Sequence, residues 1–251
     1  MWRPRSDCGT DCLPAGGRSL PAYRQVGRLI ALVTVLLAAA VALPFARRSA
    51  PFWARAVLRA AGVRLRTRGP IPRRRALLVA NHISWLDALA ILAVTPSRLL
   101  AKCDVRGWPV IGPMVAAAGT IFVDRSRPRT LPATVAEVAA ALRADAVVAV
   151  FPEGTTGCGA EVGPFRPAMF QAAIDADARV VPLTLRYTEA GAAFVGEESL
   201  ATSVRRVLAA PALHVTVCAA PALHPGEAAT RRDLATVARM AVGADRTPAL
   251  V

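Results

Sequence analysis

The sequence predicts an α/β fold, a mainly parallel sheet flanked by helices, preceded by an N-terminal membrane-anchoring helical segment. Beyond residue 66, short apolar runs alternate with longer stretches of helical periodicity. An uncharged apolar run precedes this part of the chain, and most of the net charge of +14 lies beside that run. The 251 residues suffice for one domain with a substantial core and leave little room for a second.

The apolar run occupies residues 29–46, which is at the short end of what spans a bilayer, and Pro44 favours a bend near its end. An export signal has a similar pattern. Here, however, the basic leader is long, and Arg47 and Arg48 stand where a small-residue cleavage site would be expected. Whether the run crosses the bilayer or re-enters stays open. Residues 51–66 predict an amphipathic helix that lies on the membrane surface or packs on its own domain.

Positive charge is concentrated around this anchor. Residues 1–75 contain fifteen arginines and two acidic residues, whereas the remainder has sixteen basic and fifteen acidic residues. Such a distribution favours anionic lipid head groups, and no nucleic-acid-binding module accompanies the charge, so we expect no nucleic-acid partner. The positive-inside rule places the globular part in the cytoplasm.

The hydrophobic pattern of the globular part predicts alternating strands and helices. The predicted strands are residues 75–80, 120–123, 147–151, 179–187 and 213–218. The predicted helices are residues 84–94, 130–143, 167–176 and 230–242. Pro182 falls inside the fourth strand and indicates an edge strand or a bulge.

Four regions follow from these patterns. They are a basic, disordered N-terminus at residues 1–28, the anchor with its membrane-proximal helix at 29–66, the globular domain at 67–243 and a flexible tail at 244–251. Of the five cysteines, Cys8 and Cys12 are the only close pair, and no histidine or further cysteine near them in sequence completes a zinc site. We therefore expect no metal and no disulfide framework.

A polar cluster follows the predicted strand at residues 75–80, so the side chain of His82 should emerge at its carboxyl end. Ser84 is placed to cap the next helix, and Asp87, three residues later, folds back toward it. That acid either completes a capping box or reaches the imidazole. In the second arrangement one ring nitrogen is held and the other can take a proton, which makes His82 a candidate general base.

Basic side chains follow other apolar runs. Arg125 stands just beyond residues 120–123, where a guanidinium suits a phosphate, although the chain has thirty arginines and one more at a strand end means little by itself. Lys102 is the only lysine, and it either serves a site that needs a compact ammonium or is incidental.

A third cluster, Glu153, Gly154 and Thr155, follows residues 147–151. Glycine lets the backbone approach a ligand, and amides with threonine hydroxyls can bind an anion or a developing oxyanion. Glu153 would repel a phosphate, so we assign it to orienting a neighbour such as Arg125 or to accepting a substrate hydroxyl. Taken alone, this segment is also an ordinary strand-to-loop turn.

Together these clusters form an ordered set. Asn-His-x4-Asp at residues 81–87 is followed by residues 119–125, 151–155 and 181–183, about thirty residues apart. Over residues 50–220 the set resembles the glycerolipid acyltransferase family typified by bacterial 1-acyl-glycerol-3-phosphate acyltransferases. The resemblance implies that His82 activates an acceptor hydroxyl and that Asp87 orients His82.

The same resemblance implies the rest of the site and its surroundings. The substrate-binding residues it indicates are Asn81, Lys102, Arg125, Glu153, Gly154 and Thr155. The acceptor would be a lysolipid within membrane lipids, and the donor acyl-CoA or acyl-carrier protein as co-substrate, with no cofactor. The location implied is the bacterial inner membrane, with the catalytic domain on the cytoplasmic side.

One departure from the family pattern concerns the acceptor. Many members that handle a phosphate continue the third motif with arginine after Glu-Gly-Thr, whereas this chain has Thr156 and Gly157. That run resembles the branch that acylates lyso-ornithine lipid, an aminolipid without phosphate. Arg166 can replace the missing charge, so lysophosphatidate remains the leading acceptor and lyso-ornithine lipid the alternative.

Two other classes of function fit the sequence less well. A hydrolase or thioesterase with a serine nucleophile is disfavoured because no Gly-x-Ser-x-Gly elbow is present. A non-enzymatic membrane-surface protein explains residues 1–75 but leaves the three polar clusters without a role.

Overall fold

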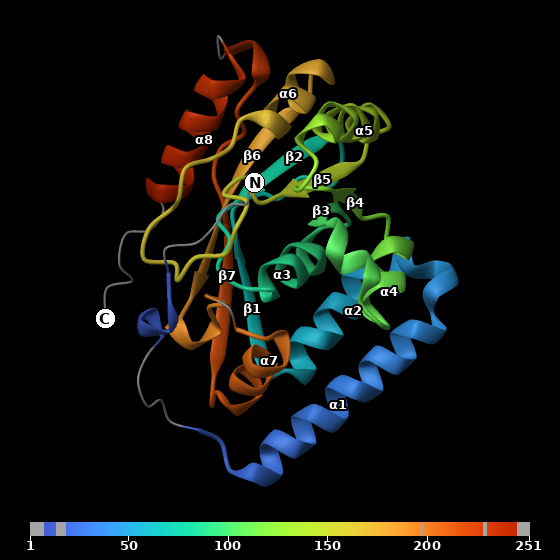
Figure 1. Cartoon of the computed structure of the whole chain (residues 1–251), viewed down its shortest axis with the longest axis vertical. Helices are drawn as coiled ribbons and strands as arrows, with labels where there is room; N and C mark the ends of the chain where they lie inside the picture. Colours follow the sequence, from blue (N-terminus) through green and yellow to red (C-terminus); the bar gives the residue numbers. More distant parts are fainter. Residues whose placement is uncertain (1–7, 14–18, 197, 228–229, 245–251) are drawn as a thin grey trace.

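The computed structural model describes residues 8–13, 19–196, 198–227 and 230–244. Within them, a seven-stranded sheet lies between two layers of helices (Figure 1). The strands are β1 (Val63–Arg68), β2 (Ala76–Ala80), β3 (Arg98–Lys102), β4 (Ile121–Val123), β5 (Val147–Val150), β6 (Arg179–Tyr187) and β7 (Leu213–Ala219). They run β1-β7-β6-β2-β5-β3-β4 across the sheet, and all neighbouring pairs except β6–β7 are parallel. The predicted α/β class with a mainly parallel sheet is confirmed.

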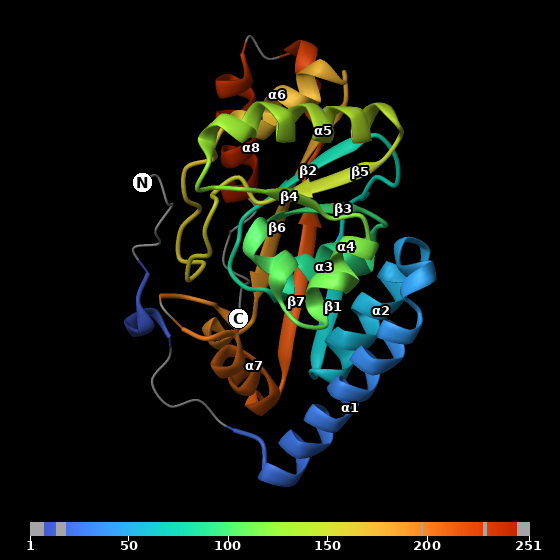
Figure 2. The ribbon, with the colours of Figure 1, turned by 45° about the vertical axis from the view of Figure 1, so that its right-hand side comes forward.

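The longer helices divide between the two faces of the sheet. They are α1 (Ala22–Val41), α2 (Ala46–Ala60), α3 (Leu86–Val94), α4 (Ile111–Ala117), α5 (Leu131–Arg143), α6 (Ala168–Asp175), α7 (Leu200–Ala209) and α8 (Arg231–Ala244). Helices α2, α3 and α7 pack on one face, and α5, α6 and α8 pack on the other, as the turned view shows (Figure 2). Helix α1 lies outside α2 and also contacts α7.

Strand β2 shows how the two faces share one core. Leu78 packs toward α2 and α3, whereas Leu77 and Val79 pack toward α5, α6 and α8. All five residues of β2 are fully buried. Because helices cover both faces, the strand is a continuous apolar run rather than an alternating one. Truncating Leu78 to alanine would therefore cost about 2–5 kcal/mol of stability.

Pro182 lies in β6, a central strand between β2 and β7, so the predicted edge position is wrong. Strand β6 runs unbroken through Pro182, and the irregularity that the alternative prediction, a bulge, anticipated lies opposite it, in residues 219–223. Val180 pairs with Leu223 and Leu183 pairs with Ala219, so the register slips by one residue between these two pairs. The proline, which has no N–H to donate, falls at this slip.

The helix predicted at residues 51–66 is wrong in its last part. Helix α2 ends at Ala60, Gly62 takes a φ of 78°, and Val63–Arg68 forms strand β1 at the edge of the sheet. The β1 segment alternates Val, Leu and Thr with Arg, which is the period of a strand. The φ of Gly62 lies in the left-handed region that favours glycine, and a Cβ atom at position 62 would also displace the Arg28 guanidinium, which it would approach to 2.1 Å.

Helix α1 begins at Ala22, seven residues before the predicted anchor and inside the stretch predicted to be disordered. It is long and apolar enough to cross a membrane. Leu32 and Ala39 are buried against the domain, while a row of apolar side chains on the other side is exposed: Val26, Leu29, Ile30, Val33, Leu37 and Val41. The tail predicted at 244–251 and the first seven residues lie almost entirely outside the described part of the chain.

Candidate active site

The predicted polar clusters gather where the parallel strands β2 and β5 end. His82 follows β2 by two residues, Phe151 and Glu153 follow β5, and Tyr187 is the last residue of the neighbouring strand β6. Strands β5 and β6 both pair with β2, so their carboxyl ends lie on either side of the His82 loop. Functional groups collect at this edge of an open α/β sheet.

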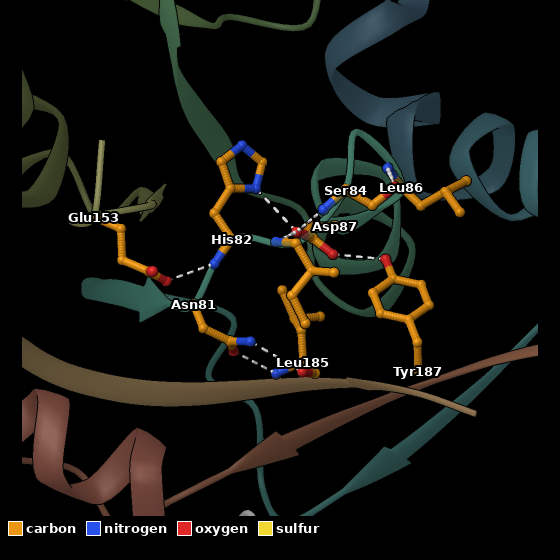
Figure 3. Close-up of polar contacts among 9 residues, drawn as sticks. Asn81, His82, Ser84, Leu86, Asp87, Glu153, Leu185 and Tyr187 are labelled. Atoms are coloured by element: carbon orange, nitrogen blue, oxygen red, sulfur yellow. Dashed lines mark hydrogen bonds and ion pairs between the residues drawn. The ribbon is translucent and has the colours of Figure 1, made fainter. Parts of the chain in front are cut away.

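His82 and Asp87 are in direct contact, as the motif predicted. Nδ1 of His82 lies 2.9 Å from Oδ2 of Asp87 (Figure 3). The same carboxylate oxygen accepts the backbone N–H groups of Ile83 at 2.6 Å and Ser84 at 2.8 Å. The fold-back expected of a capping box and the contact with the imidazole therefore both occur, and they share one oxygen.

Tyr187 completes the hydrogen bonding of this acid, a role that no motif in the sequence indicates. Its hydroxyl donates to Oδ1 of Asp87 at 2.6 Å from a position 100 residues further along the chain (Figure 3). Asp87 is fully buried, and its four hydrogen bonds offset the cost of burying a carboxylate. Burial raises the pKa of Tyr187 well above its ordinary value, and the Asp87 charge raises it further, so the hydroxyl stays a donor.

The hydrogen-bond pattern fixes the tautomer of His82. A carboxylate that accepts from two backbone amides and a tyrosine hydroxyl has no proton to give, so Nδ1 of the histidine is the donor. The ring stacks on Phe151, with centroids 4.0 Å apart and planes 14° apart. Its side chain is 20% exposed, and among the described residues no hydrogen bond engages Nε2. The unprotonated nitrogen is thus available to a ligand.

Glu153 supports the His82 backbone rather than a guanidinium. Its carboxylate accepts the His82 N–H at 2.8 Å and the Gly163 N–H at 3.0 Å. Burial raises the pKa of Glu153 above its ordinary value, and the two N–H donors oppose that shift. Of the two roles predicted for Glu153, orienting a neighbour is the one seen, but the neighbour is His82 and not Arg125.

Arg125 and Arg166 both attach to the backbone of the two-residue segment Glu153–Gly154. Arg125 donates to the Gly154 carbonyl oxygen, and Nε of Arg166 lies 3.3 Å from the Glu153 carbonyl oxygen. Burial lowers the pKa of Arg125, and the nearby Arg166 charge lowers it further. Gly154 has a φ of 77°, a conformation that favours glycine, so this turn depends on the predicted residue. Two cations are thereby held close together beside the His82 loop.

The remaining predicted residues are placed less directly. Asn81 is buried, and both ends of its side-chain amide bond the backbone of Leu185, at 3.0 and 2.7 Å (Figure 3). Lys102 is exposed at the carboxyl end of β3, and in the described chain no hydrogen bond or ion pair joins it to His82. Thr155 follows Gly154 and is half-buried. Its backbone N–H makes no hydrogen bond to any residue that the structure describes.

Comparison with known proteins identifies the same region. The acyltransferase family model matches residues 62–186, which contain every site residue above except Tyr187. The lyso-ornithine lipid O-acyltransferase of Pseudomonas aeruginosa is 30% identical over 206 residues, covering 79% of this chain and 78% of the relative. The 1-acyl-sn-glycerol-3-phosphate acyltransferase of Neisseria meningitidis is 41% identical over 135 residues, covering 53% of each. The chain thus spans about half the length of the Neisseria relative.

A solved structure agrees on the fold. The crystal structure of the 1-acyl-sn-glycerophosphate acyltransferase PlsC from Thermotoga maritima superposes with a TM-score of 0.61 at 19% identity, covering 87% of this chain and 94% of that one. At this identity the similarity shows the architecture alone, while the sequence match to the Pseudomonas relative extends over most of both chains. The chain therefore belongs to the acyltransferase family that contains these lysolipid acyltransferases.

Proposed function

We propose that this chain is an O-acyltransferase that moves a fatty acyl group from a thioester carrier to the free hydroxyl of a lysolipid. One observation carries the proposal. The imidazole of His82 is held at Nδ1 by a buried carboxylate and presents an unengaged Nε2 at the partly exposed edge of the sheet. A histidine oriented in this way is a general base for a weakly acidic hydroxyl.

The reaction proceeds by direct transfer. Nε2 of His82 removes the proton of the acceptor hydroxyl as its oxygen attacks the thioester carbonyl carbon, and Asp87 stabilises the imidazolium that forms. The tetrahedral intermediate collapses, the carbon–sulfur bond breaks, and the imidazolium returns the proton to the leaving thiolate. An alcohol and a thioester thus become an ester and a thiol. General-base assistance of this kind is worth about 10²–10⁴-fold in rate.

The loop after β5 supplies donors for the developing oxyanion. The Gly157 N–H is engaged by the His82 carbonyl oxygen at 2.8 Å, which joins this loop to the His82 loop. Within the described chain, the N–H groups of Thr155 and Thr156 remain without a hydrogen bond. We assign Thr155 to the oxyanion through its backbone amide, because backbone donors fixed in a loop need no reorganisation as charge develops.

The leading acceptor is 1-acyl-sn-glycerol-3-phosphate, which would give phosphatidate. Arg125 and Arg166 lie near each other, and both hydrogen bond to the Glu153–Gly154 segment, whose carboxylate also holds the His82 backbone. A phosphate between the two guanidiniums would relieve their mutual repulsion and bring the glycerol hydroxyl toward the imidazole. Asn81 is better suited to hold the strand ends than to contact substrate, since its amide is already bonded at both ends.

A second acceptor, lyso-ornithine lipid, is favoured by a different observation. The relative that aligns with most of this chain is named a lyso-ornithine lipid O-acyltransferase, and Thr156 stands where many phosphate-handling members have arginine. The donor in either case is acyl-CoA or acyl-carrier protein, and the transfer needs no further cofactor.

Helix α1 supplies the attachment to the membrane. One of its sides packs on the domain through Leu32 and Ala39, and Arg28 near its start donates to the carbonyl oxygens of Leu208 at 3.0 Å and of Ala210 at 2.6 Å. A helix held along one side in this way presents only its outer apolar face to lipid. We assign it to one leaflet, with the basic residues around it on the cytoplasmic side of the inner membrane.

The general-base role is tested with His82→Ala in membranes that carry the full chain, together with His214→Ala as a matched control on β7. The native chain and the control should consume acyl thioester only when a lysolipid is added. His82→Ala should lose about 10²–10⁴-fold of that rate while remaining folded by circular dichroism. Unchanged turnover in His82→Ala, or consumption that needs no lysolipid, would rule the proposal out.

The acceptor is tested with Arg166→Ala and an exposed control, Arg129→Ala, each assayed with lysophosphatidate and with lyso-ornithine lipid. If phosphate binds between the arginines, Arg166→Ala raises KM for lysophosphatidate at least 10-fold, since a charge-assisted hydrogen bond is worth about 1.5–3 kcal/mol. The control should keep the native KM. Turnover with lyso-ornithine lipid alone would replace the leading acceptor with the alternative.

A further inference from the structure

Three cysteines that are remote in sequence meet beside the His82 loop. The sulfur atoms of Cys8, Cys12 and Cys158 all lie within 4.8 Å of one another, although Cys8 and Cys158 are 150 residues apart. The sulfurs of a tetrahedral zinc site lie about 3.8 Å apart, given zinc–sulfur bonds of about 2.3 Å. We propose that Cys8, Cys12 and Cys158 bind a Zn²⁺ ion as three thiolates.

The local sequence suits such a site. Cys8 and Cys12 have the C-x3-C spacing of zinc ligands, and the turn between them is closed by a hydrogen bond from the Cys12 N–H to the Gly9 carbonyl oxygen at 3.2 Å. Cys158 stands between two glycines, of which Gly159 has a φ of 85°. The tight backbone on both sides lets the ligands converge without steric conflict.

A backbone donor is already in place for one ligand. The Cys158 N–H points at the sulfur of Cys8 at 3.3 Å. Hydrogen bonds of this kind stabilise a metal-bound thiolate and orient it. The sequence alone predicts no metal because no third ligand lies near Cys8 and Cys12 along the chain. Folding brings that ligand, Cys158, from the loop after β5.

Metal binding fits the cluster better than a disulfide does. A disulfide would join only two of the sulfurs and leave the third in contact with them, and its formation would need an oxidant. Zn²⁺ binding needs only that each thiol release its proton to solvent, and water can take the fourth position. Cys103 is not part of the cluster, and its thiol contacts Asp104 instead.

The ion would fasten the N-terminal segment over the active-site loops. Cys8, Leu13 and Cys158 pack against a small apolar cluster that contains Ile83, the residue after His82. The loop that carries Cys158 donates the Gly157 N–H to the His82 carbonyl oxygen. This consequence for the catalytic loop rests on the proposed function. The binding of zinc does not, so the two can fail separately.

The test uses the full-length chain purified in detergent, stripped with a chelator and titrated with Zn²⁺ or, as a spectroscopic probe, Co²⁺. The variants are Cys8→Ser, Cys12→Ser and Cys158→Ser, with Cys103→Ser as the matched control. The native chain and the control should bind about one ion per chain, and Co²⁺ should show thiolate charge-transfer absorption. Each of the other variants should lose about 100-fold or more in affinity.

Thiol modification followed by mass spectrometry gives a second measurement that does not depend on catalysis. Zn²⁺ should protect Cys8, Cys12 and Cys158 from alkylation and leave Cys103 reactive. The proposal is overturned if the native chain binds no Zn²⁺, if the three variants bind it as well as the control does, or if two of the cysteines are linked by a disulfide in the protein from reducing cells.

Discussion

The active-site end of the sheet and helix α1 differ in how far the chain itself satisfies their side chains. Asp87 is fully buried and meets four donors from the chain itself, so every direction around the carboxylate is already specified. Helix α1 instead leaves a row of apolar side chains uncovered, with Ile30 61% and Leu37 62% exposed. The first region is completed by folding, and we propose that a lipid surface completes the second. Changes in the first should therefore alter chemistry and stability, and changes in the second should alter location.

The largest effect is expected from Asp87. Three N–H donors converge on Oδ2, so an asparagine must place its oxygen there and its amide nitrogen toward Tyr187, whose hydroxyl can turn to accept. Asp87→Asn then keeps the tautomer of His82 but loses the charge that stabilises the imidazolium. We expect acyl transfer to fall about 10²-fold in Asp87→Asn and about 10³–10⁴-fold in Asp87→Ala, measured as kcat in membranes.

The two variants also differ in stability. Asp87→Ala leaves the N–H groups of Ile83 and Ser84 buried without their acceptor, at about 1–3 kcal/mol each, whereas Asp87→Asn satisfies both. Chemical denaturation of the purified chain measures the difference, and the exposed Asp177→Asn is the control. Equal stability and equal activity of the two Asp87 variants would show that the hydrogen bonds to this side chain matter neither for folding nor for the orientation of His82.

The second prediction concerns the outer face of α1. The double variant Ile30→Asp and Leu37→Asp should fold and keep its active-site geometry but bind lipid vesicles at least 10-fold more weakly, since each charge costs up to about 2.5–3.5 kcal/mol in an apolar layer. Flotation with vesicles that contain anionic lipid gives the bound fraction. The lipid dependence of binding then reports on α1 and not on the catalytic residues.

A matched control lies on α8, at the far end of the molecule from α1 (Figure 1). Val237→Asp with Met240→Asp makes the same chemical change at exposed apolar positions, 41% and 60% exposed. This pair should leave the bound fraction unchanged. If both pairs weaken binding alike, the contrast between the outer face of α1 and the rest of the surface fails.

The contrast also explains what the sequence could predict. His82 and Asp87 are five residues apart, so a local capping pattern offered their contact as one of two alternatives, and the family motif favoured it. Tyr187 could not be found in this way, because its contact with Asp87 joins positions 100 residues apart and depends on β6 lying beside β2. The only available signal was its position at the carboxyl end of a predicted strand. The cluster of Cys8, Cys12 and Cys158 needed the fold for the same reason.

The fold class was predictable because buried parallel strands are continuous apolar runs, as in β2. Short elements were harder to predict. The short strand β3 and the helices α4 and α7 were not predicted, although Ser199 caps α7 through the Thr202 N–H at 3.2 Å. The arginines of β1 suggest a basic amphipathic helix. Only their alternation with apolar residues, at a period of two, indicates the strand that forms.

The third prediction concerns Tyr187, whose hydroxyl is the one donor to Oδ1 of Asp87 in the described chain. Tyr187→Phe removes one of four hydrogen bonds and leaves the three N–H donors on Oδ2 in place. We expect a loss of about 1–3 kcal/mol in the free energy of unfolding and less than about 10-fold in kcat, because the tautomer of His82 is still fixed. Tyr23→Phe, exposed on α1, is the control. A loss in kcat as large as that of Asp87→Ala would mean that Tyr187 contacts substrate.

The smallest effect is expected from Glu153, and it appears as a dependence on pH. Because burial holds the folded pKa of Glu153 above the ordinary value of 4.5, the unfolded chain loses this proton first as the pH rises. The contribution of Glu153 to stability is therefore full below pH 4.5 and declines as the pH rises through the folded pKa. Glu153→Gln does not titrate, so the free energy of unfolding of the native chain should fall relative to this variant between about pH 4 and pH 7.

Urea unfolding at both ends of that range, with the exposed Glu137→Gln as control, measures this relative change. The side-chain amide of the Glu153→Gln variant keeps one acceptor for the N–H groups of His82 and Gly163, so a constant offset between the two chains is expected at every pH. The test is therefore the change of this stability difference with pH, and not its absolute size. A slope of opposite sign would mean that the two N–H donors outweigh burial. The hydrogen bonds to Glu153 would then stabilise its charged form by more than burial destabilises it.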